Sequence, residues 1–371
     1  MKKLLLITDN YAPRIDGIAR FLIELIPYLK KHFEVKVLAP DFGEYHGIIP
    51  HIKIPLFNVF VGDFQVAKPK RKIIKKAVKD ADLVFVQTIG TIGYFGIKYA
   101  KKYKKPLVAF KHSLEWELVP YAVNRPFFYR LLNSVIRTFS KRIYNKCDII
   151  MCPSKNIAEK LSWYNIKAKK VVVPVGVNAS EFIPPKNKAA AKESIGINPE
   201  LTVLGYHGRL AHEKGLKSLA RVYRQIGRRK NNLMLLLLGE GVKEIKEFTQ
   251  DKGAVIITGK KNVVPYLQAM DIYCMPSLTE TSCLSLIEAM SCQLPVIATK
   301  TGMIPEYIKD EENGLLIEKN STYFLYKQLK RLIEDKELRQ KISINARKTV
   351  VKIFNWENTA NKIIKILKQI V

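Results

Sequence analysis

The stretch Pro184-Pro185-Lys186-Asn187-Lys188 interrupts a regular alternation of short apolar runs with longer helical patterns. Six apolar runs precede it, at residues 4–8, 34–39, 83–87, 107–111, 149–153 and 171–174. The alternation then restarts, with runs at residues 202–207, 233–238, 255–258, 272–275, 295–299 and 314–317. Such alternation is typical of parallel sheets with crossover helices. The sequence therefore predicts an α/β chain of two doubly wound domains, residues 1–185 and 186–352, with a basic amphipathic helix within 353–371 that packs back toward the first domain.

Length and composition agree with two domains and indicate an anionic partner. A chain of 371 residues exceeds the size at which one core stops growing. Lys and Arg number 63 against 33 Asp and Glu, a net charge of +30, which suits nucleic acid, an anionic membrane surface or phosphorylated substrates. No apolar run approaches the roughly 20 residues that span a bilayer, so no transmembrane segment is expected.

The five cysteines are odd in number and form no C-x-x-C pair. They indicate neither a disulfide framework nor a zinc site, and they fit a reducing cytosol. We interpret them as core residues.

Two glutamates, Glu280 and Glu288, flank the start of a predicted helix that continues as Ala289-Met290. The spacing places Glu288 about two helical turns beyond the loop of Glu280, on the inner face of the helix. The two carboxylates can then reach one elongated ligand, such as the hexose and the ribose of a nucleotide sugar. Taken alone, a loop glutamate and a solvated helix glutamate explain the pair equally well.

Further candidates also follow predicted strands. Ligands of doubly wound sheets bind outside the carboxyl ends of the strands, so the site is expected in a cleft between the two domains. Gly17 opens a helix whose N-terminus favours an anion, although a tight turn without a ligand is the simpler alternative. Arg209 and Lys214 flank a turn and suit a diphosphate, or are solvated charges. His112 can bond a sugar hydroxyl, or is a buried histidine satisfied by backbone.

Two basic stretches have the composition of membrane-interfacial segments. Residues 68–79 form a predicted helix of cations with a thin apolar stripe, and residues 125–142 interleave arginines with aromatic and aliphatic residues. The alternative for both stretches is an ordinary solvated helix face. The candidate membrane and acceptor residues are Lys70, Arg71, Lys72, Lys75, Lys76, Phe127, Phe128 and Arg130.

Taken together, these residues resemble the retaining nucleotide-sugar transferases of glycosyltransferase family 4, which have the GT-B fold. The resemblance extends over nearly the whole chain and implies two Rossmann-like domains facing across a cleft. The motifs that carry it include Pro13-x-x-x-Gly17-Ile18, His112-Ser113, Pro153-Ser154, Gly208-Arg209-Leu210, Glu213-Lys214-Gly215, Gly239-Glu240-Gly241 and the segment from Glu280 to Met290.

The resemblance also implies roles by position. It places Arg209 and Lys214 on the donor diphosphate, Glu288 on the ribose, Glu280 on the donor hexose, Gly17 near the phosphates and His112 at the reacting sugar. Gly239, Ser282, Cys283 and Leu284 fall at positions that surround the donor. The sequence departs from the family pattern where Ser282 and Cys283 replace an aromatic residue and a glycine, and where Asp16 and Met303 each replace one glycine of a pair. The fold normally holds its donor without a metal, so no metal and no cofactor are expected.

Within the family, the motifs look most like the lipid-glycosylating branch, which includes diacylglycerol glucosyltransferases and phosphatidylinositol mannosyltransferases. This implies transfer of a hexose from UDP-glucose or GDP-mannose to a membrane lipid, by a protein bound peripherally to the cytoplasmic face of the membrane. The alternative is the same reaction on a soluble sugar, a sugar phosphate or a lipid-linked oligosaccharide. A basic nucleic-acid-binding protein is a remote alternative, because no helix-turn-helix, stacking signature or zinc spacing is present; no nucleic-acid partner is expected.

Overall fold

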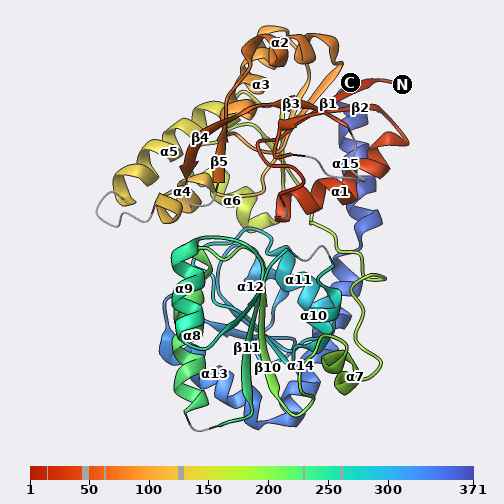
Figure 1. The fold of residues 1–371 in the computed structure, drawn as a ribbon. Coiled ribbons are helices and arrows are strands. Elements are labelled where there is room, and N and C mark those ends of the chain that lie inside the picture. The colour runs from red at the N-terminus through yellow and green to blue at the C-terminus, as the bar shows by residue number, and fades with distance from the viewer. Residues whose placement is uncertain (15, 44–49, 62–63, 124–128, 229, 260–261) are drawn as a thin grey trace. The chain divides into compact units, whose positions relative to one another are not determined.

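The computed structural model of the protein describes residues 1–14, 16–43, 50–61, 64–123, 129–228, 230–259 and 262–371. The chain divides into two compact units. The first comprises Met1–Val175 together with Glu357–Val371, and the second comprises Gly176–Trp356. Each unit contains its own parallel sheet flanked by helices (Figure 1), so the predicted α/β fold class is confirmed.

The Pro184-Pro185 stretch lies inside the second unit. Phe182, two residues before Pro184, is buried, and its carbonyl oxygen accepts hydrogen bonds from Ser291 Oγ at 2.7 Å and from the Arg347 guanidinium at 3.0 Å. These bonds tie the chain ahead of the prolines to helices of the second unit. The second unit therefore begins earlier in the chain than the break in the sequence pattern, at Gly176.

The sheet of the first unit has the strand order β3-β2-β1-β6-β7-β8-β9, and its pairs are parallel. Every residue of β6 and of β7 is buried, as expected for strands covered by helices on both faces. The chain leaves β1 toward β2 and returns on its other side at β6, so the order reverses between β1 and β6. The strands are β1 (Lys3–Ile7), β2 (Glu34–Pro40), β3 (His51–Ile54), β6 (Leu83–Val86), β7 (Leu107–Phe110), β8 (Ile149–Cys152) and β9 (Lys169–Val172).

The helices of the first unit connect these strands, and one arrives from the end of the chain. Helix α15 (Trp356–Gln369) joins this unit, where Thr359 Oγ1 donates a hydrogen bond to the carbonyl oxygen of Pro174 at 2.8 Å. The other helices are α1 (Gly17–Lys30), α2 (Arg71–Asp80), α3 (Thr91–Lys102), α4 (Glu115–Val123), α5 (Tyr129–Tyr144) and α6 (Lys155–Trp163).

The sequence pattern did not predict three strands of the first unit. Strand β3 extends the sheet beyond β2, while β4 (Leu56–Val61) and β5 (Phe64–Ala67) form a separate antiparallel pair. Four consecutive residues of β4 are exposed, so this strand lacks the alternation or the fully apolar run by which strands are recognised.

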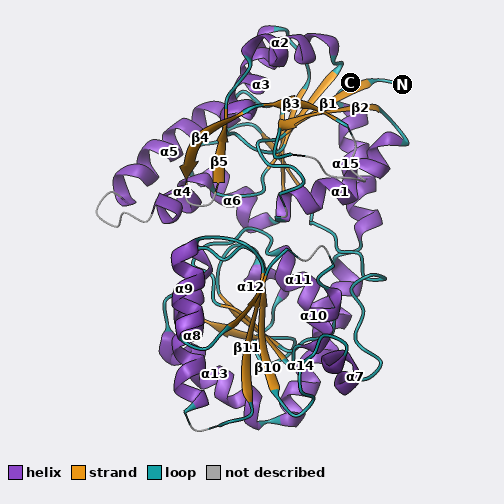
Figure 2. Cartoon of the chain, in the orientation of Figure 1, coloured by secondary structure: helices purple, strands orange, loops and turns teal. Residues whose placement is uncertain are grey.

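The sheet of the second unit has the order β12-β11-β10-β13-β14-β15, again with parallel pairs. Helices cover both faces (Figure 2): α8 and α13 pack together on one face, and α11 and α14 on the other. The strands are β10 (Thr202–His207), β11 (Leu233–Leu238), β12 (Val255–Ile257), β13 (Ile272–Met275), β14 (Val296–Thr299) and β15 (Leu315–Ile317). The helices are α7 (Lys188–Glu193), α8 (Leu216–Gly227), α9 (Lys243–Asp251), α10 (Val264–Ala269), α11 (Leu284–Ser291), α12 (Ile304–Tyr307), α13 (Thr322–Glu334) and α14 (Lys336–Ile353).

All five cysteines are buried and none forms a disulfide. Burial raises the pKa of the Cys147 and Cys274 thiols to about 12. These side chains are therefore neutral thiols in the cores of the units, as the sequence predicted.

Candidate functional site

The strand order of the second unit selects one place for a ligand. From β10 the chain proceeds outward to β11 and β12, whereas from β13 it proceeds in the opposite direction to β14 and β15. The switch point is therefore the gap between the carboxyl ends of β10 and β13, where ligands of doubly wound sheets bind. Arg209 follows β10, and Glu280 follows β13, so the topology brings these two predicted residues to the same place.

The turn after β10 is formed by close packing of backbone against backbone. A Cβ added to Gly239, which follows β11, would lie only 2.0 Å from the carbonyl oxygen of Gly208. Gly239 also has a φ of 150°, which L side chains rarely adopt. The buried Tyr206 side chain donates a hydrogen bond to the carbonyl oxygen of Arg209 at 2.8 Å. Gly239 thus supports the turn that presents Arg209.

The two predicted cations of this turn are both paired with carboxylates. The Arg209 guanidinium donates to the buried carboxylate of Glu213. The Lys214 ammonium, at the end of a 3-10 helix (His212–Lys214), donates to Glu280 Oε1 at 2.6 Å. Burial alone lowers the pKa of Lys214, but the charges of Glu280 and Glu213 outweigh it and raise that pKa. Lys214 is therefore charged at neutral pH, beside the first of the two predicted glutamates.

Glu288 lies on the inner face of α11, as its spacing predicts. Its side chain is about as buried as that of His207, at 6% and 5% exposure. The Nε2 atom of His207 lies 2.7 Å from Glu288 Oε2. The second predicted glutamate is thus held by the last residue of β10. The end of β10 and the turn that follows it hold both carboxylates, through His207 and Lys214.

The loop between Glu280 and α11 contains the residues that depart from the family pattern. Cys283 immediately precedes α11 and has a φ of 56°, in the left-handed region that favours glycine. The position that the family fills with glycine therefore keeps a glycine-like conformation. Ser282 is buried, and its carbonyl oxygen accepts a hydrogen bond from Tyr307 at 3.4 Å, while Leu284 begins α11.

The loop after β14, which contains Gly302 and Met303, packs against the loop of Glu280. A Cβ added to Gly302 would lie 2.3 Å from the carbonyl oxygen of Glu280. Met303, which replaces the second glycine of a pair, donates its backbone N–H to the carbonyl oxygen of Thr281 at 2.8 Å and buries its side chain. The loop of Glu280 is thus fixed by backbone packing on one side and by Lys214 on the other.

In the first unit, His112 lies at the carboxyl end of β7. One of its ring nitrogens, Nε2, lies 2.9 Å from Oε1 of Gln87, which follows β6. The ring is stacked on Phe110 and meets Phe21 edge-on, with centroid separations of 4.6 and 4.8 Å. Burial and the charge of the adjacent Lys111 lower the pKa of His112 to about 3. The imidazole is therefore neutral at physiological pH and can exchange hydrogen bonds with a hydroxyl without carrying charge.

Gly17 is the first residue of α1, one helical turn before Phe21, so this helix end and His112 belong to the same region of the first unit. The Asp16 carboxylate accepts hydrogen bonds from the backbone N–H groups of Ile18 and Ala19 at 2.9 and 3.0 Å. The helix N-terminus thus already holds one carboxylate from its own chain.

The basic candidates lie on the surface of the first unit. Lys72, Lys75 and Lys76 project from α2 as exposed side chains, while its Ile74 and Val78 are buried. The other exposed candidates are Lys70, Arg71 and Arg130. Phe127 and Phe128 lie outside the residues that the structure describes.

Sequence reasoning assigned no contact to three residues that hold the predicted ones in place: Glu213, His207 and Gln87. Glu213 stands four residues after Arg209, but the segment between them is not α-helical, so helical spacing does not indicate this pair. His207 is the last residue of a buried strand, the same signal that singled out His112. Gln87 is the last residue of the predicted apolar run 83–87. Its residue type does not distinguish it from any other buried amide.

Metal ligands are not gathered at these positions. Among the described residues, no three His, Cys, Asp or Glu side chains form a group that could hold an ion. The one Asp-x-Asp sequence, Asp80-Ala81-Asp82, lies at the end of α2, where the Asp82 carboxylate accepts a hydrogen bond from the backbone of Lys3 at 2.8 Å.

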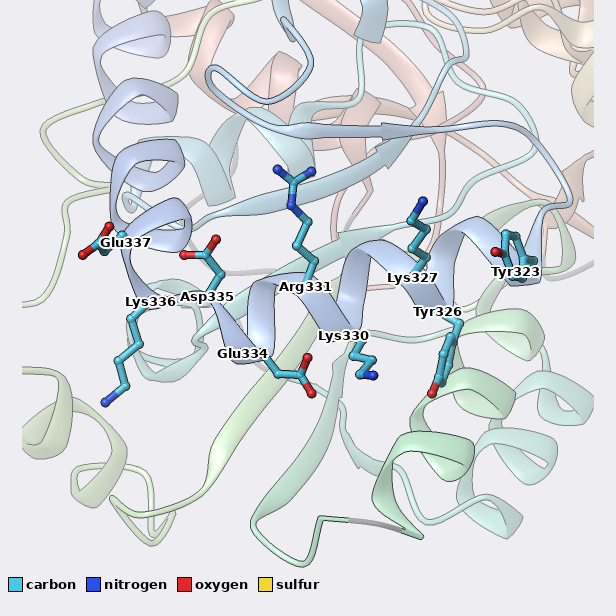
Figure 3. Close-up of a pocket in the computed structure, with 9 residues that line it drawn as sticks. All are labelled: Tyr323, Tyr326, Lys327, Lys330, Arg331, Glu334, Asp335, Lys336 and Glu337. Carbon is cyan, nitrogen blue, oxygen red and sulfur yellow. The ribbon is translucent and has the colours of Figure 1, made fainter.

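An open depression of about 900 Å³ lies elsewhere on the second unit, along α13 and the start of α14. Tyr323, Lys327 and Arg331 project from α13 on the same side (Figure 3). The depression includes none of the residues that follow the strands, and Arg331 is paired with Glu311. We assign it no role in the site. Of the helices described, none is both long and apolar enough to cross a membrane.

Comparison with known proteins gives two family models that match successive parts of the chain. The model described as Glycosyltransferase Family 4 matches residues 15–181, and the model described as Glycosyl transferases group 1 matches residues 187–349. Together they cover every strand of the two sheets except β1.

Curated relatives are similar over most of their length. The alpha-monoglucosyldiacylglycerol synthase of Streptococcus pneumoniae is 25% identical over 336 residues, which cover 84% of this chain and 74% of that protein. The protein of the same name from Acholeplasma laidlawii is 23% identical over 362 residues, covering 91% and 90%. Among solved structures, sucrose-phosphate synthase from Thermosynechococcus elongatus has a TM-score of 0.79 at 20% identity, covering 100% of this chain and 99% of that one. This likeness shows the fold, a GT-B pair of Rossmann-like units.

Proposed function

The chain belongs to glycosyltransferase family 4, and we propose that it is a retaining hexosyltransferase that binds a nucleotide-diphosphate sugar at the switch point of its second unit. The observation that carries this proposal is the assembly of Arg209, Lys214, Glu280 and Glu288 around the ends of β10 and β13. Two cations and two carboxylates match the two kinds of group on such a donor, the phosphates and the sugar hydroxyls.

The two cations, Arg209 and Lys214, suit a diphosphate that binds with the donor and is released as part of the product. Arg209 can bind phosphate oxygens through two N–H groups, and Lys214 supplies a point charge beside it. Within the chain, Glu213 and Glu280 balance these charges. When the donor binds, its phosphates take the place of a carboxylate on Lys214, and Glu280 becomes available to the hydroxyls of the hexose.

In the reaction, the bond between the anomeric carbon and the phosphate oxygen breaks, and the nucleoside diphosphate leaves with the electron pair. The acceptor oxygen bonds to the same face of the anomeric carbon, and its proton passes to the departing phosphate. Arg209 and Lys214 stabilise the charge that develops on the leaving group, which is the electrostatic task that a metal performs elsewhere. We therefore propose that the reaction requires no added metal and no cofactor.

His112 is proposed to bind a hydroxyl of the reacting sugar. Its lowered pKa keeps the imidazole neutral, so it orients the hydroxyl by hydrogen bonding and does not donate a proton as an acid at neutral pH. Gly17 lies in the same region, but the Asp16 carboxylate occupies amides of that helix end. A direct role of Gly17 with the donor phosphates would require Asp16 to move.

A membrane lipid is the acceptor that we propose. The exposed face of α5 supports this, because Leu131, Val135 and Phe139 recur every four residues and are 62%, 58% and 43% exposed. Arg130 and Arg142 are exposed on the same helix. An apolar stripe flanked by cations is suited to the headgroup region of an anionic membrane.

Two further features of the first unit support a membrane-facing surface. The cationic α2 is one of them. The other is the β4–β5 hairpin, in which Phe57, Val59 and Phe60 are exposed; β4 packs against α4, and α4 pairs with α5. Two curated relatives are named for a glucosylated diacylglycerol, which also supports a lipid acceptor. The protein would then act as a peripheral enzyme at the cytoplasmic face of the membrane.

The test is a transfer assay with radiolabelled UDP-glucose and GDP-mannose. Each donor is offered with diacylglycerol or phosphatidylinositol in vesicles that contain phosphatidylglycerol, and separately with soluble sugars and sugar phosphates, all in the presence of a chelator. We expect label in the lipid extract and salt-sensitive flotation of the protein with the vesicles. Label only on a soluble acceptor, without flotation, would refute the lipid proposal, and strict dependence on Mg²⁺ or Mn²⁺ would refute metal independence.

A further inference from the structure

His207 occupies a position in the candidate donor site that neither its sequence motif nor the proposed reaction accounts for. It is the last residue of β10, and its side chain is only 5% exposed. Its Nε2 atom lies 2.7 Å from Oε2 of Glu288. The hydrogen bond joins the strand that precedes the cationic turn to the helix that carries the ribose-binding candidate.

The histidine itself is held in one orientation. The hydroxyl group of Tyr273, on β13, donates a hydrogen bond to the carbonyl oxygen of His207 at 3.1 Å. The Tyr273 ring meets the imidazole edge-on, with centroids 5.5 Å apart. The same hydroxyl interacts with Ser285, one helical turn before Glu288 on α11. Tyr273 therefore connects His207 and α11 by a second route.

The other ring nitrogen indicates which tautomer is present. Among the described residues, Nδ1 of His207 is buried and has no hydrogen-bond partner. A proton on Nδ1 would leave an unsatisfied buried N–H group, which is costly. A proton on Nε2 instead donates to the Glu288 carboxylate and leaves only a lone pair on Nδ1. The geometry thus favours Nε2–H as a donor to Glu288.

We propose that His207 is a positioning residue for Glu288, which engages one carboxylate oxygen and thereby orients the other toward the ribose hydroxyls of the nucleotide. This inference rests on the proposed function, because it takes Glu288 to be the group that binds the ribose.

The experiment compares two ligands on the same protein. We would measure the dissociation constants of UDP or GDP, whichever binds more tightly, and of its 2′,3′-dideoxy analogue. The proteins are the wild type, Glu288→Ala, His207→Leu, His207→Asn and His207→Gln. The ratio of the two constants reports the bonds to the ribose and cancels any general loss of folded protein. Ser291→Ala is the matched control, because it removes a buried hydrogen bond at the other end of α11, to Phe182.

We expect the wild type to prefer the ribonucleotide by about 10-fold or more, the value of one hydrogen bond to a charged group. His207→Leu and His207→Asn should reduce this preference to about 3-fold or less. His207→Gln, whose longer amide can still reach the carboxylate, should restore a good part of it. Ser291→Ala should lower stability and leave the ratio unchanged. If His207→Leu does not fold, His207→Asn decides the question.

The outcomes separate this inference from the proposal beneath it. A wild-type preference that disappears in Glu288→Ala and survives in the Leu and Asn variants would overturn the role of His207 and leave the ribose assignment intact. A preference absent from the wild type, or retained in Glu288→Ala, would overturn the assignment of Glu288 itself.

Discussion

The carboxyl ends of the strands have similar architecture in the two sheets, but the candidate residues there differ in charge: acid–base pairs in the second unit and a neutral imidazole in the first. In the second unit, the switch point gathers three acid–base pairs: Arg209 with Glu213, Lys214 with Glu280, and His207 with Glu288. In the first unit, His112 is surrounded by the rings of Phe21 and Phe110 and by the amide of Gln87.

The buried charge near His112 is sequestered. The Lys111 ammonium pairs with Glu115 and lies over the ring of Tyr144 at 4.1 Å, with the Lys111 side chain fully buried. This difference shows that the topology of a parallel sheet determines where a ligand binds, whereas the side chains at the strand ends determine whether that ligand is charged or neutral. The second unit suits a charged donor, and the first suits neutral hydroxyls.

The largest effect is expected at the charged end. Arg209→Ala should reduce kcat/KM by about 100-fold or more, because one preorganised donor to a developing negative charge is worth that much. Circular dichroism should show an unchanged fold. Arg331→Ala is the matched control, since this arginine also pairs with a glutamate but lies on α13. Near-normal turnover in Arg209→Ala would remove the diphosphate assignment.

The next effect concerns the exposed cations of the first unit. Reversing Lys70, Arg71 and Lys72 to Glu should weaken binding to anionic vesicles by about 100-fold or more, since each cation lost near such a surface removes about 1 kcal/mol and the new carboxylates are repelled. Nucleotide binding should not change. The matched control reverses Lys327, Lys330 and Lys336, which are exposed on α13 and α14 of the second unit. Equal loss of vesicle binding in both triple variants would mean that only net charge matters.

A smaller effect is expected at the neutral end. His112→Ala should lower kcat by about 10-fold, the scale of one neutral hydrogen bond, with little change in nucleotide affinity. An equal loss of nucleotide affinity and turnover would contradict the separation of charged and neutral ends.

The pH dependence of stability gives a second test of His112. Its pKa is about 3 in the folded chain, against 6.5 for an unperturbed histidine. Between these values the unfolded state binds more protons, so this residue contributes stability that is fully present above pH 6.5 and declines as the pH falls toward 3. Chemical denaturation across this range should therefore show that the free energy of unfolding depends less steeply on pH in His112→Gln than in the wild type. An unchanged slope would mean that the pKa of the imidazole is not lowered in the folded chain.

The smallest effect is expected at Cys283. Replacement by glycine removes a buried thiol but relieves a left-handed backbone that costs an L residue about 1–2 kcal/mol. Cys292→Gly removes a similar buried thiol at a φ of −73°, where nothing is relieved. Cys292→Gly should therefore be more destabilising by about 1 kcal/mol. Equal losses in the free energy of unfolding would show that Cys283 is not strained.

The sequence predicted the parts of this comparison that depend on local pattern. Strands and helices of fully apolar or periodic runs were recognised, including α2 and α15, and Glu288 was expected on the inner face of its helix. The β4–β5 hairpin was missed because its exposed residues follow no period. The contacts of His207 with Glu288 and of Gln87 with His112 were missed because they depend on the order in which strands lie in the sheet, which a single sequence does not reveal. The contact of Glu213 with Arg209 was missed because it closes a turn that is not α-helical.

The most direct measurement of the central claim is thermal unfolding with UDP, GDP, UDP-glucose or GDP-mannose in the presence of a chelator, for the wild type and Glu288→Ala. A ligand at 100 times its dissociation constant stabilises a protein by about 2.7 kcal/mol, which is several degrees for a unit of this size. We predict that one nucleotide and its sugar shift the wild type and that the shift largely disappears in Glu288→Ala. No shift with any of the four, or the same shift in both proteins, would contradict a nucleotide-sugar site at the end of β10 and β13.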